Sequence, residues 1–125
     1  MIPGELRYHK EHEWVRLDGS QATIGISHHA QDALGDVVFI DLPQVDKTVS
    51  ADEEIGEVES TKATSSIYCP VGGKIVKVNT DLQDHPEYLN QDPYGTGWIV
   101  VVELADPAQV DSLMDASQYE AFLSS

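Results

Sequence analysis

The chain carries at residues 54–68 the stretch Glu54-Ile55-Gly56-Glu57-Val58-Glu59-Ser60-Thr61-Lys62-Ala63-Thr64-Ser65-Ser66-Ile67-Tyr68, which decides its fold. The two ends of this stretch, Glu54 to Ser60 and Ser65 to Tyr68, have the composition of two short β-strands. Residues 61–64 join them and are small or polar apart from Lys62. The stretch therefore predicts a β-hairpin with Lys62 at or beside its turn.

Further strands are expected on both sides of this hairpin. Ala22 to Ile26 alternates apolar residues with Thr23 and Gly25, which is the period of two typical of a half-buried strand. Ser27 is expected to cap a short helix that runs to Leu34 and ends at Gly35. The remaining strands are predicted at Val37 to Asp41, Lys74 to Val78 and Trp98 to Leu104, the last of them nearly all apolar and buried on both faces.

The end of the chain changes to a helical period. Asp106 and Pro107 are typical of a helix start, and Asp115 with Gln118 three residues later is expected to open a final helix. The apolar face of that helix carries Tyr119, Phe122 and Leu123. Short strands with helices at the edges predict a mainly β sandwich or flattened barrel. A chain of 125 residues has room for one domain, residues 1–125.

The composition is strongly acidic, with 7 Lys and Arg against 22 Asp and Glu and a formal net charge of -15. This charge repels phosphate backbones and anionic headgroups, so neither nucleic acid nor a membrane is an expected partner. It favours encounter with proteins that present basic patches. Cys69 is the only cysteine, which indicates a reducing compartment, and Met1 to Glu5 shows no targeting peptide. We expect a cytoplasmic monomer.

The sequence contains no convincing catalytic or metal site. His9-Lys10-Glu11-His12-Glu13 has its histidines three apart, whereas the helical zinc motif needs them four apart. His28 and His29 are adjacent and therefore point in different directions on a helix. Cys69 has no base beside it and is expected to be a small buried thiol. We therefore predict neither a catalytic residue nor a metal ion.

Lys62 differs from the other basic residues in its surroundings. Ser60 and Thr61 precede it and Ala63-Thr64-Ser65-Ser66 follows, so all of its near neighbours are small. An enzyme that modifies an ε-amino group needs a lysine of this kind, projected from a tight turn without bulky neighbours. The spacing alone also fits an ordinary solvated lysine at a hairpin tip.

The segment Glu57-Val58-Glu59-Ser60-Thr61-Lys62-Ala63 resembles the lipoylation segment of the glycine cleavage H protein family, whose usual form is Val-Glu-Ser-Val-Lys-Ala. The resemblance continues in order through nearly the whole chain. The other matching segments are His12-Glu13-Trp14-Val15, Thr23-Ile24-Gly25-Ile26, Leu34-Gly35-Asp36-Val37-Val38-Phe39, Leu42-Pro43, Tyr68-Cys69-Pro70-Val71-Gly72-Gly73, Val78-Asn79, Pro86-Glu87-Tyr88-Leu89-Asn90, Asp92-Pro93-Tyr94-Gly95 and Gly97-Trp98-Ile99.

The resemblance implies a barrel-sandwich hybrid fold of the lipoyl-domain type, with short peripheral helices and a C-terminal helix. It also implies lipoate attached to Lys62, with Glu59, Ser60, Thr61 and Ala63 as the residues recognised around it. Such a protein is not an enzyme but a carrier whose cofactor performs the chemistry. In this family the lipoyl arm, which is the lysine side chain with its attached lipoate, accepts an aminomethyl group. A pyridoxal-phosphate enzyme, glycine decarboxylase, supplies this group by decarboxylating glycine. The arm presents this group to a tetrahydrofolate-dependent aminomethyltransferase and is reoxidised by dihydrolipoyl dehydrogenase; lipoylating enzymes are further implied partners.

Members of the family hold the loaded arm in a surface cleft near the His-Glu-Trp segment. The resemblance therefore implies that Glu13 contacts the positively charged aminomethyl nitrogen, since a carboxylate there can make a charge-assisted hydrogen bond. The alternative for Glu13 is a solvated acid beside a core tryptophan. Ser66 departs from the family pattern, because an aspartate often stands at its position.

Other functions of the same lysine stay open. A biotinyl domain would place methionines beside the lysine, whereas Thr61 and Ala63 stand there in this chain. A lipoate relay, in which an H-like protein supplies lipoyl groups to other enzymes, would use Lys62 in the same way. An unmodified binding module would follow if Lys62 were never acylated.

Overall fold

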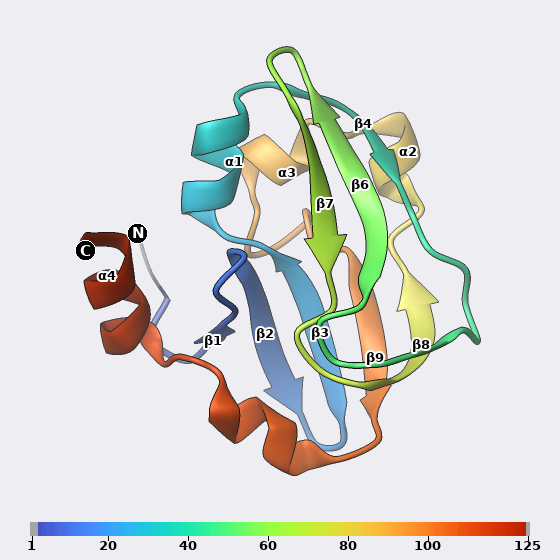
Figure 1. Cartoon of the computed structure of the whole chain (residues 1–125). Helices are drawn as coiled ribbons and strands as arrows, with labels where there is room; N and C mark the ends of the chain where they lie inside the picture. The colour runs from blue at the N-terminus through green and yellow to red at the C-terminus, as the bar shows by residue number, and fades with distance from the viewer. Residues whose placement is uncertain (1–2, 125) are drawn as a thin grey trace.

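The computed structural model describes residues 3–124, and Met1, Ile2 and Ser125 lie outside it. The segment Met1 to Glu5, in which no targeting peptide is expected, is therefore described only in part. Two antiparallel sheets lie face to face (Figure 1). The larger sheet has six strands, in the order β1 (Arg7–Tyr8), β2 (Glu13–Asp18), β3 (Gln21–Ile26), β9 (Val100–Leu104), β8 (Gly73–Val78) and β5 (Thr48–Val49). The smaller sheet has three strands, in the order β4 (Val37–Asp41), β6 (Glu54–Ser60) and β7 (Thr64–Tyr68).

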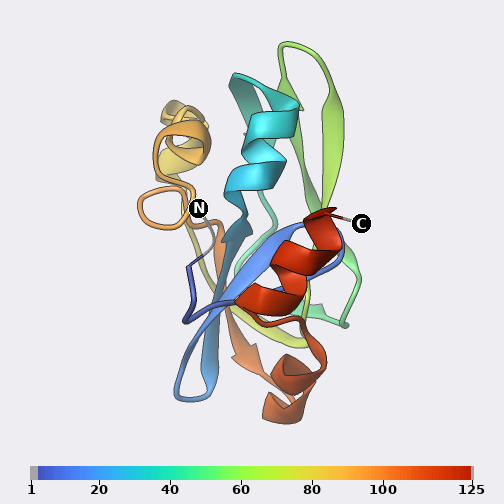
Figure 2. The same cartoon turned by 90° about the vertical axis from the view of Figure 1, so that its left-hand side faces the viewer.

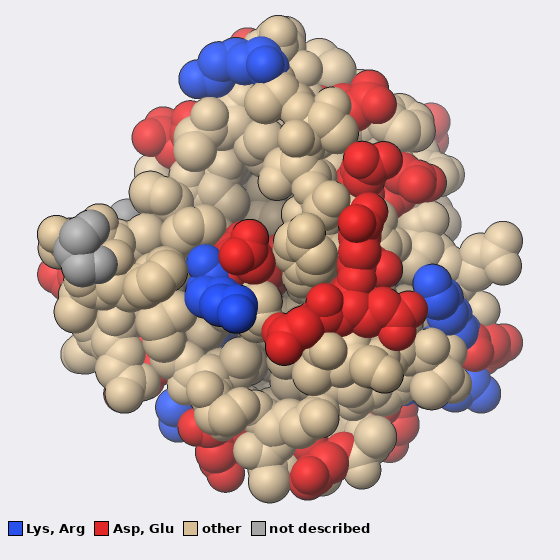
Figure 3. Space-filling model, in the orientation of Figure 1, with Lys and Arg blue, Asp and Glu red and all other residues tan. Residues whose placement is uncertain are grey.

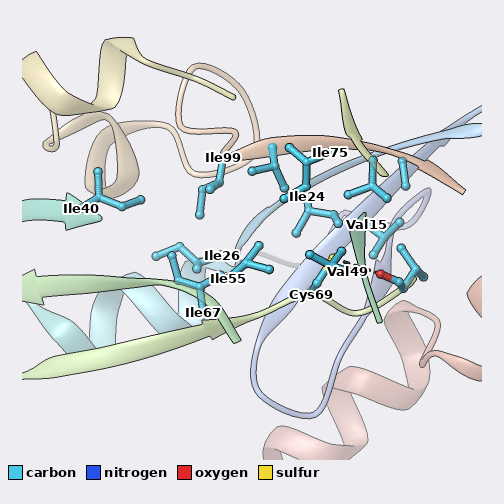
Figure 4. Close-up of a cluster of buried hydrophobic side chains, with 14 of the residues drawn as sticks. Val15, Ile24, Ile26, Ile40, Val49, Ile55, Ile67, Cys69, Ile75 and Ile99 are labelled. Carbon is cyan, nitrogen blue, oxygen red and sulfur yellow. Dashed lines mark hydrogen bonds between the residues drawn. The ribbon is translucent and has the colours of Figure 1, made fainter. Parts of the chain in front are cut away.

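The hydrophobic core lies between the two sheets. Side chains from both sheets point toward one another and are almost completely buried (Figure 4). They include Val15, Ile24 and Ile75 from the larger sheet, and Ile40, Ile55 and Ile67 from the smaller one. Burial of one such side chain contributes roughly 1.5–3 kcal/mol. Contact between the sheets is therefore the main driving force for this fold, as expected of a mainly β sandwich.

The predicted hairpin is present and consists of β6 and β7. Its last strand pair joins Glu59 to Thr64, so the turn is one residue shorter at its C-terminal end than expected from the sequence. Both views show the hairpin extending beyond the rest of the sheets, with its tip beside helix α1 (Figures 1 and 2).

The helix expected after Ser27 is confirmed as α1 (His28–Leu34). The Ser27 hydroxyl accepts a hydrogen bond from the backbone N–H of Ala30 at 3.2 Å, and the Gly35 N–H donates to the Gln31 carbonyl at 3.0 Å. Gly35 has a φ of 76° and a ψ of -156°, a conformation that is essentially restricted to glycine. Two further short helices, α2 (Asp81–Asp84) and α3 (Tyr88–Gln91), were not predicted as elements.

The tail forms η1 (Pro107–Ser112) and α4 (Ala116–Ser124), and both helix starts are confirmed. The Asp106 side chain caps η1, which is a 3₁₀ helix. Asp115 and Gln118 exchange side-chain to backbone hydrogen bonds of 2.9 and 2.8 Å, which is the geometry of a capping box. On the apolar face of α4, the Tyr119 ring stacks on Tyr8 with centroids 4.4 Å apart, whereas Phe122 is 41% exposed.

The strand expected at Trp98 to Leu104 begins later, at Val100, and is not buried throughout. The Asn79 amide donates to the backbone carbonyls of Thr96 and Trp98 at 2.9 and 2.7 Å, so this backbone bonds to a side chain where a strand partner was expected. Val100, Val101 and Val102 are buried, but Glu103 is exposed. Strands β1, β2 and β5 were not predicted.

Candidate functional site

The hairpin tip is ordered by Ser60. The Ser60 hydroxyl donates to the Ala63 carbonyl at 3.1 Å and accepts the N–H groups of Lys62 and Ala63 at 3.2 and 3.0 Å. The Ser60 N–H closes the turn by donating to the same Ala63 carbonyl at 2.8 Å. One small hydroxyl group thus satisfies the backbone around Lys62, while the Lys62 side chain stays exposed at the end of the hairpin.

The tip is also joined to the end of helix α1. The Thr61 N–H donates to the Asp36 carbonyl at 3.0 Å, which links the turn to the segment that follows the helix. The Lys62 side chain lies across Gly35, because a Cβ atom at Gly35 would come within 2.9 Å of Lys62 Cε. A side chain at position 35 would therefore displace the lysine as well as strain the backbone.

A cleft of about 340 Å³ runs between the hairpin and α1. Figure 3 shows the surface hollowed between these elements. Three segments line it, namely one face of α1 (His29, Ala30, Ala33, Leu34), the start of β7 with the residue before it (Ala63, Thr64, Ser65, Ser66) and the β1–β2 loop (Glu11, His12, Glu13). The cleft thus leads from the neighbour of Lys62 to Glu13.

Glu13 lies at the inner end of the cleft and is 1% exposed, so the idea of a solvated acid is wrong. One of its oxygens, Oε2, accepts the N–H of Tyr68 at 3.0 Å. The other oxygen, Oε1, lies 3.2 Å from Nδ1 of His9 and accepts no standard hydrogen bond from the described residues. Glu13 therefore presents one fixed and one available oxygen.

His9 belongs to a segment whose histidine spacing does not fit the helical zinc motif, and its ring is buried beside Glu13. Its Nδ1 atom accepts the backbone N–H of Glu11 at 3.1 Å and faces Glu13 Oε1. Its Nε2 atom lies 2.5 Å from Oδ1 of Asp52, whose side chain is 66% exposed. Asp52 belongs to the turn before β6, so the pair joins two loops that are distant in the sequence.

The pKa values of His9 and Glu13 are shifted in the same direction. The Glu13 carboxylate beside the ring, aided by Asp52, raises the pKa of His9 although burial opposes this. Burial raises the pKa of Glu13, and the neighbouring His9 and the hydrogen bond from the Tyr68 N–H oppose that rise. Both shifts favour a proton shared between Nδ1 and Oε1, which would otherwise face each other as a lone pair and an anion.

A second polar group lies behind His12, which lines the cleft. The Tyr119 hydroxyl lies 2.8 Å from both His12 Nδ1 and Ser27 Oγ, so the C-terminal helix holds the β1–β2 loop and the cap of α1 together. The rings of His12 and His29 are 4.6 Å apart at the cleft. Burial is the main cause that lowers the pKa of His12.

The residues expected from the sequence are only partly brought together. Ala63 and Glu13 line the same cleft, whereas Glu59, Ser60 and Thr61 lie outside its lining. Ser66 also lines the cleft. His9, Asp52, His12 and His29 were missed as site residues, because nothing in the local sequence shows which distant residues they meet.

Cys69 is buried, and burial raises the pKa of its thiol to about 12, as expected of a structural cysteine. Among residues 3–124, no three His, Cys, Asp or Glu side chains are grouped so that they could hold a metal ion. In the same part of the chain, no helix is long and apolar enough to span a membrane.

Two facing sheets, a protruding hairpin with an exposed lysine at its tip, and peripheral helices define a lipoyl-domain-like barrel-sandwich fold. The family model for the glycine cleavage H-protein matches residues 6–125. The chain therefore belongs to the glycine cleavage H-protein family, whose members are lipoate carriers.

Individual relatives agree with this assignment. The chain is 52% identical over 121 residues to the glycine cleavage system H protein of Symbiobacterium thermophilum, covering 97% of this chain and 94% of the relative. It is 53% identical over 122 residues to that of Myxococcus xanthus, covering 98% and 95%. A crystal structure of a glycine cleavage system H protein from Mycobacterium marinum has a TM-score of 0.90 and 42% identity, covering 99% of this chain and all of the other.

Proposed function

We propose that this chain is the lipoyl-carrying shuttle of a glycine cleavage system, with lipoate attached to Lys62. The observation that carries this proposal is the arrangement of an exposed lysine at a hairpin tip beside a cleft that ends at a buried carboxylate. An attachment point must be reachable by other proteins, and Lys62 meets this requirement.

The residues present fit a lipoyl group. The cleft begins next to Lys62 at Ala63, its walls include the apolar side chains of Ala33 and Leu34, and Glu13 supplies a carboxylate at its inner end. When bound, lipoate supplies a reducible disulfide that can carry a one-carbon amine. Glu13 would hold the positively charged nitrogen of such an amine through Oε1 and so exclude water from it.

The proposed partners follow from the same assignment. They are glycine decarboxylase, the aminomethyltransferase, dihydrolipoyl dehydrogenase and the enzymes that attach lipoate. Exposed acids on β4 and β6, namely Asp41, Glu54, Glu57 and Glu59, support docking to basic surfaces, and Figure 3 shows acidic side chains gathered over this face. A weak docking contact suffices, because a tethered group has a high effective concentration at each partner.

The proposal includes a non-catalytic role for the chain, since catalysis would belong to the cofactor and the partners. It also includes one carrier domain, residues 1–125, and a monomeric state. A cytoplasmic location stays a prediction from the sequence.

Replacement of Lys62 by Arg tests the proposal. Lys62→Arg keeps the charge but removes the primary amine, so we expect complete loss of lipoylation and of shuttle activity with an unchanged circular dichroism spectrum. Lys74→Arg, at an exposed position on β8, is the matched control and should keep both. Intact-mass and peptide mass spectrometry of protein from lipoate-replete cells provide the readout.

A lipoyl mass increment in the Lys62→Arg protein would contradict the attachment site. If Lys62 of the wild-type protein carried no lipoate, the chain would instead be a binding module without a cofactor. Lipoylation of Lys62 without activity in a reconstituted glycine cleavage system would support a lipoate relay.

A further inference from the structure

We propose that His9 is a positioning residue of the cleft and acts as a proton-dependent counter-ion for Glu13. When protonated, His9 donates Nδ1–H to Oε1 of Glu13; when neutral, it leaves this oxygen to a cationic group in the cleft. The proposal rests on the proposed function, because the cationic group is the amine that the arm carries.

The position of His9 Nδ1 supports this inference directly. One donor, the Glu11 N–H, lies 3.1 Å from Nδ1, and one acceptor, Glu13 Oε1, lies 3.2 Å from it. A neutral Nδ1 accepts from Glu11, whereas a protonated Nδ1 donates to Glu13. The same ring orientation therefore provides a partner for His9 in both protonation states.

Asp52 keeps the ring in this orientation. Nε2 of His9 lies 2.5 Å from Asp52 Oδ1, so Nε2–H is the proton that stays on the ring in both states. The Asp52 backbone is itself fixed by donating its N–H to the Cys69 carbonyl at 2.7 Å. Only the Nδ1 proton is then free to leave.

Burial explains why Glu13 needs a counter-ion. A carboxyl group that is 1% exposed and has no charged neighbour would stay protonated at neutral pH, since desolvation disfavours the anion. A neutral carboxyl group could not attract a cation. His9 beside it favours the ionised form of Glu13, which can then exchange one cation for another.

The other charged groups around His9 are few. On the same loop lie Lys10, Glu11 and His12, and burial lowers the pKa of His12, which disfavours a second positive ring. The turn before β6 contributes Asp52 and the neighbouring Glu53, and Tyr68 and Cys69 approach from the end of β7. The cation closest to Glu13 Oε1 among these groups is His9 itself.

The exchange has a defined proton balance. A cationic amine that binds Oε1 displaces the Nδ1 proton of His9, and this proton goes to water. One charge enters the cleft and one leaves it, so the retention of the amine must depend on pH. Linkage through one proton changes the binding constant by at most about tenfold per pH unit.

The first test uses the unmodified chain and needs no lipoate. We would follow the His9 ring by nitrogen-15 NMR during a pH titration of the wild type and of Glu13→Gln, Asp52→Asn and Glu57→Gln. The titration midpoint of His9 should fall in Glu13→Gln and in Asp52→Asn, whereas it should stay unchanged in Glu57→Gln, an exposed control on β6. An unchanged midpoint in Glu13→Gln would overturn the pairing.

The second test uses lipoylated protein loaded by glycine decarboxylase and glycine. We expect the loaded form of the wild type to decay more slowly as the pH rises through the His9 titration. In His9→Asn this dependence should be absent, so the ratio of the two decay rates should change severalfold. Parallel pH profiles would overturn the counter-ion role, and Asp52→Asn provides a second variant if His9→Asn does not fold.

Failure of this inference differs from failure of the proposed function. If Lys62 is never lipoylated, mass spectrometry shows it, whereas the NMR titration still tests the pairing of His9 with Glu13. If Lys62 is lipoylated and loaded but the decay profiles are parallel, the carrier function stands and the role of His9 is wrong.

Discussion

The hairpin tip and the inner end of the cleft are both built from polar groups, yet they are organised in opposite ways. At the tip, Ser60 satisfies the turn from within four consecutive residues, and Lys62 is exposed. At the inner end, the Glu13 carboxylate is buried beside His9, and the Tyr68 N–H that binds it comes from a strand 55 residues further along the chain. The hairpin tip is exposed to solvent and held by contacts between neighbouring residues. The inner end of the cleft is buried and depends on contacts between distant segments.

The difference suits the two tasks of a carrier. A lysine that other enzymes must reach gains nothing from burial, because a buried amine would be shielded from them. A carboxylate that must hold one small cation gains from burial, because electrostatic attraction is stronger where water is excluded. The cleft between α1 and β7 connects these two environments.

The largest expected effect follows from a change at the buried inner end of the cleft. Glu13→Gln keeps the shape and the hydrogen bond from Tyr68 but removes the charge, so the loaded form should decay roughly 10 to 100 times faster, as expected for the loss of a charged hydrogen bond of about 1.5–3 kcal/mol. Lipoylation of Lys62 should be unaffected. Decay of the loaded protein, followed by mass spectrometry, is the measurement.

Glu11→Gln is the matched control for this prediction, because Glu11 also lines the cleft but is exposed. It should change the decay rate far less than Glu13→Gln does. Equal effects of the two variants would mean that the overall charge of the cleft, and not the buried carboxylate, retains the amine.

The second prediction concerns Gly35, which supports the Lys62 side chain. Gly35→Ala should lower the free energy of unfolding by about 1–3 kcal/mol, since this backbone conformation is essentially restricted to glycine. The new Cβ should also displace Lys62, which lies 2.9 Å away at Cε. Urea unfolding measures the loss, and the rate of lipoylation reports the displacement.

Gly19→Ala separates these two effects. Gly19 also has a positive φ, of 62°, but an added Cβ there meets nothing within 4 Å. It should cost stability without altering lipoylation. If Gly35→Ala behaves in the same way as Gly19→Ala, the contact between Lys62 and Gly35 has no influence on modification.

The smallest expected effect concerns the exposed hairpin tip. Ser60→Ala removes the hydroxyl that orders the turn, but the exposed N–H groups of Lys62 and Ala63 can bond to water instead. We expect a loss of about 0.5–1.5 kcal/mol and a modest slowing of lipoylation. Ser65→Ala, at an exposed position on β7, should change neither quantity. A loss much above this range would show that the tip contributes to the global fold.

The local elements were predictable because each is encoded by neighbouring residues. The cap at Ser27, the glycine at position 35 and the capping box at Asp115 act within a few residues, and all three are confirmed. The strand at Trp98 was wrong at its start, because the side chain of Asn79, the residue after β8, bonds to that backbone. Short strands such as β5 carry too little pattern to be recognised.

The candidate site was predictable only at its outer end. Lys62 was found from its small neighbours and from resemblance, and the structure places it at the hairpin tip. Resemblance also indicated Glu13, but the sequence could not show whether it is buried. The pairing of His9 with Asp52 spans 43 residues and has no local signal.

The hairpin, the helix ends and the acidic charge could be read from the sequence, because they depend on residue types and on spacings of a few residues. Three features depend on the packing of distant segments: Glu13 is buried, His9 and Asp52 meet beside it, and the cleft leads from the neighbour of Lys62 to this carboxylate. The physical reason is that burial and charge pairing depend on which distant segments pack together, and packing of the two sheets establishes that.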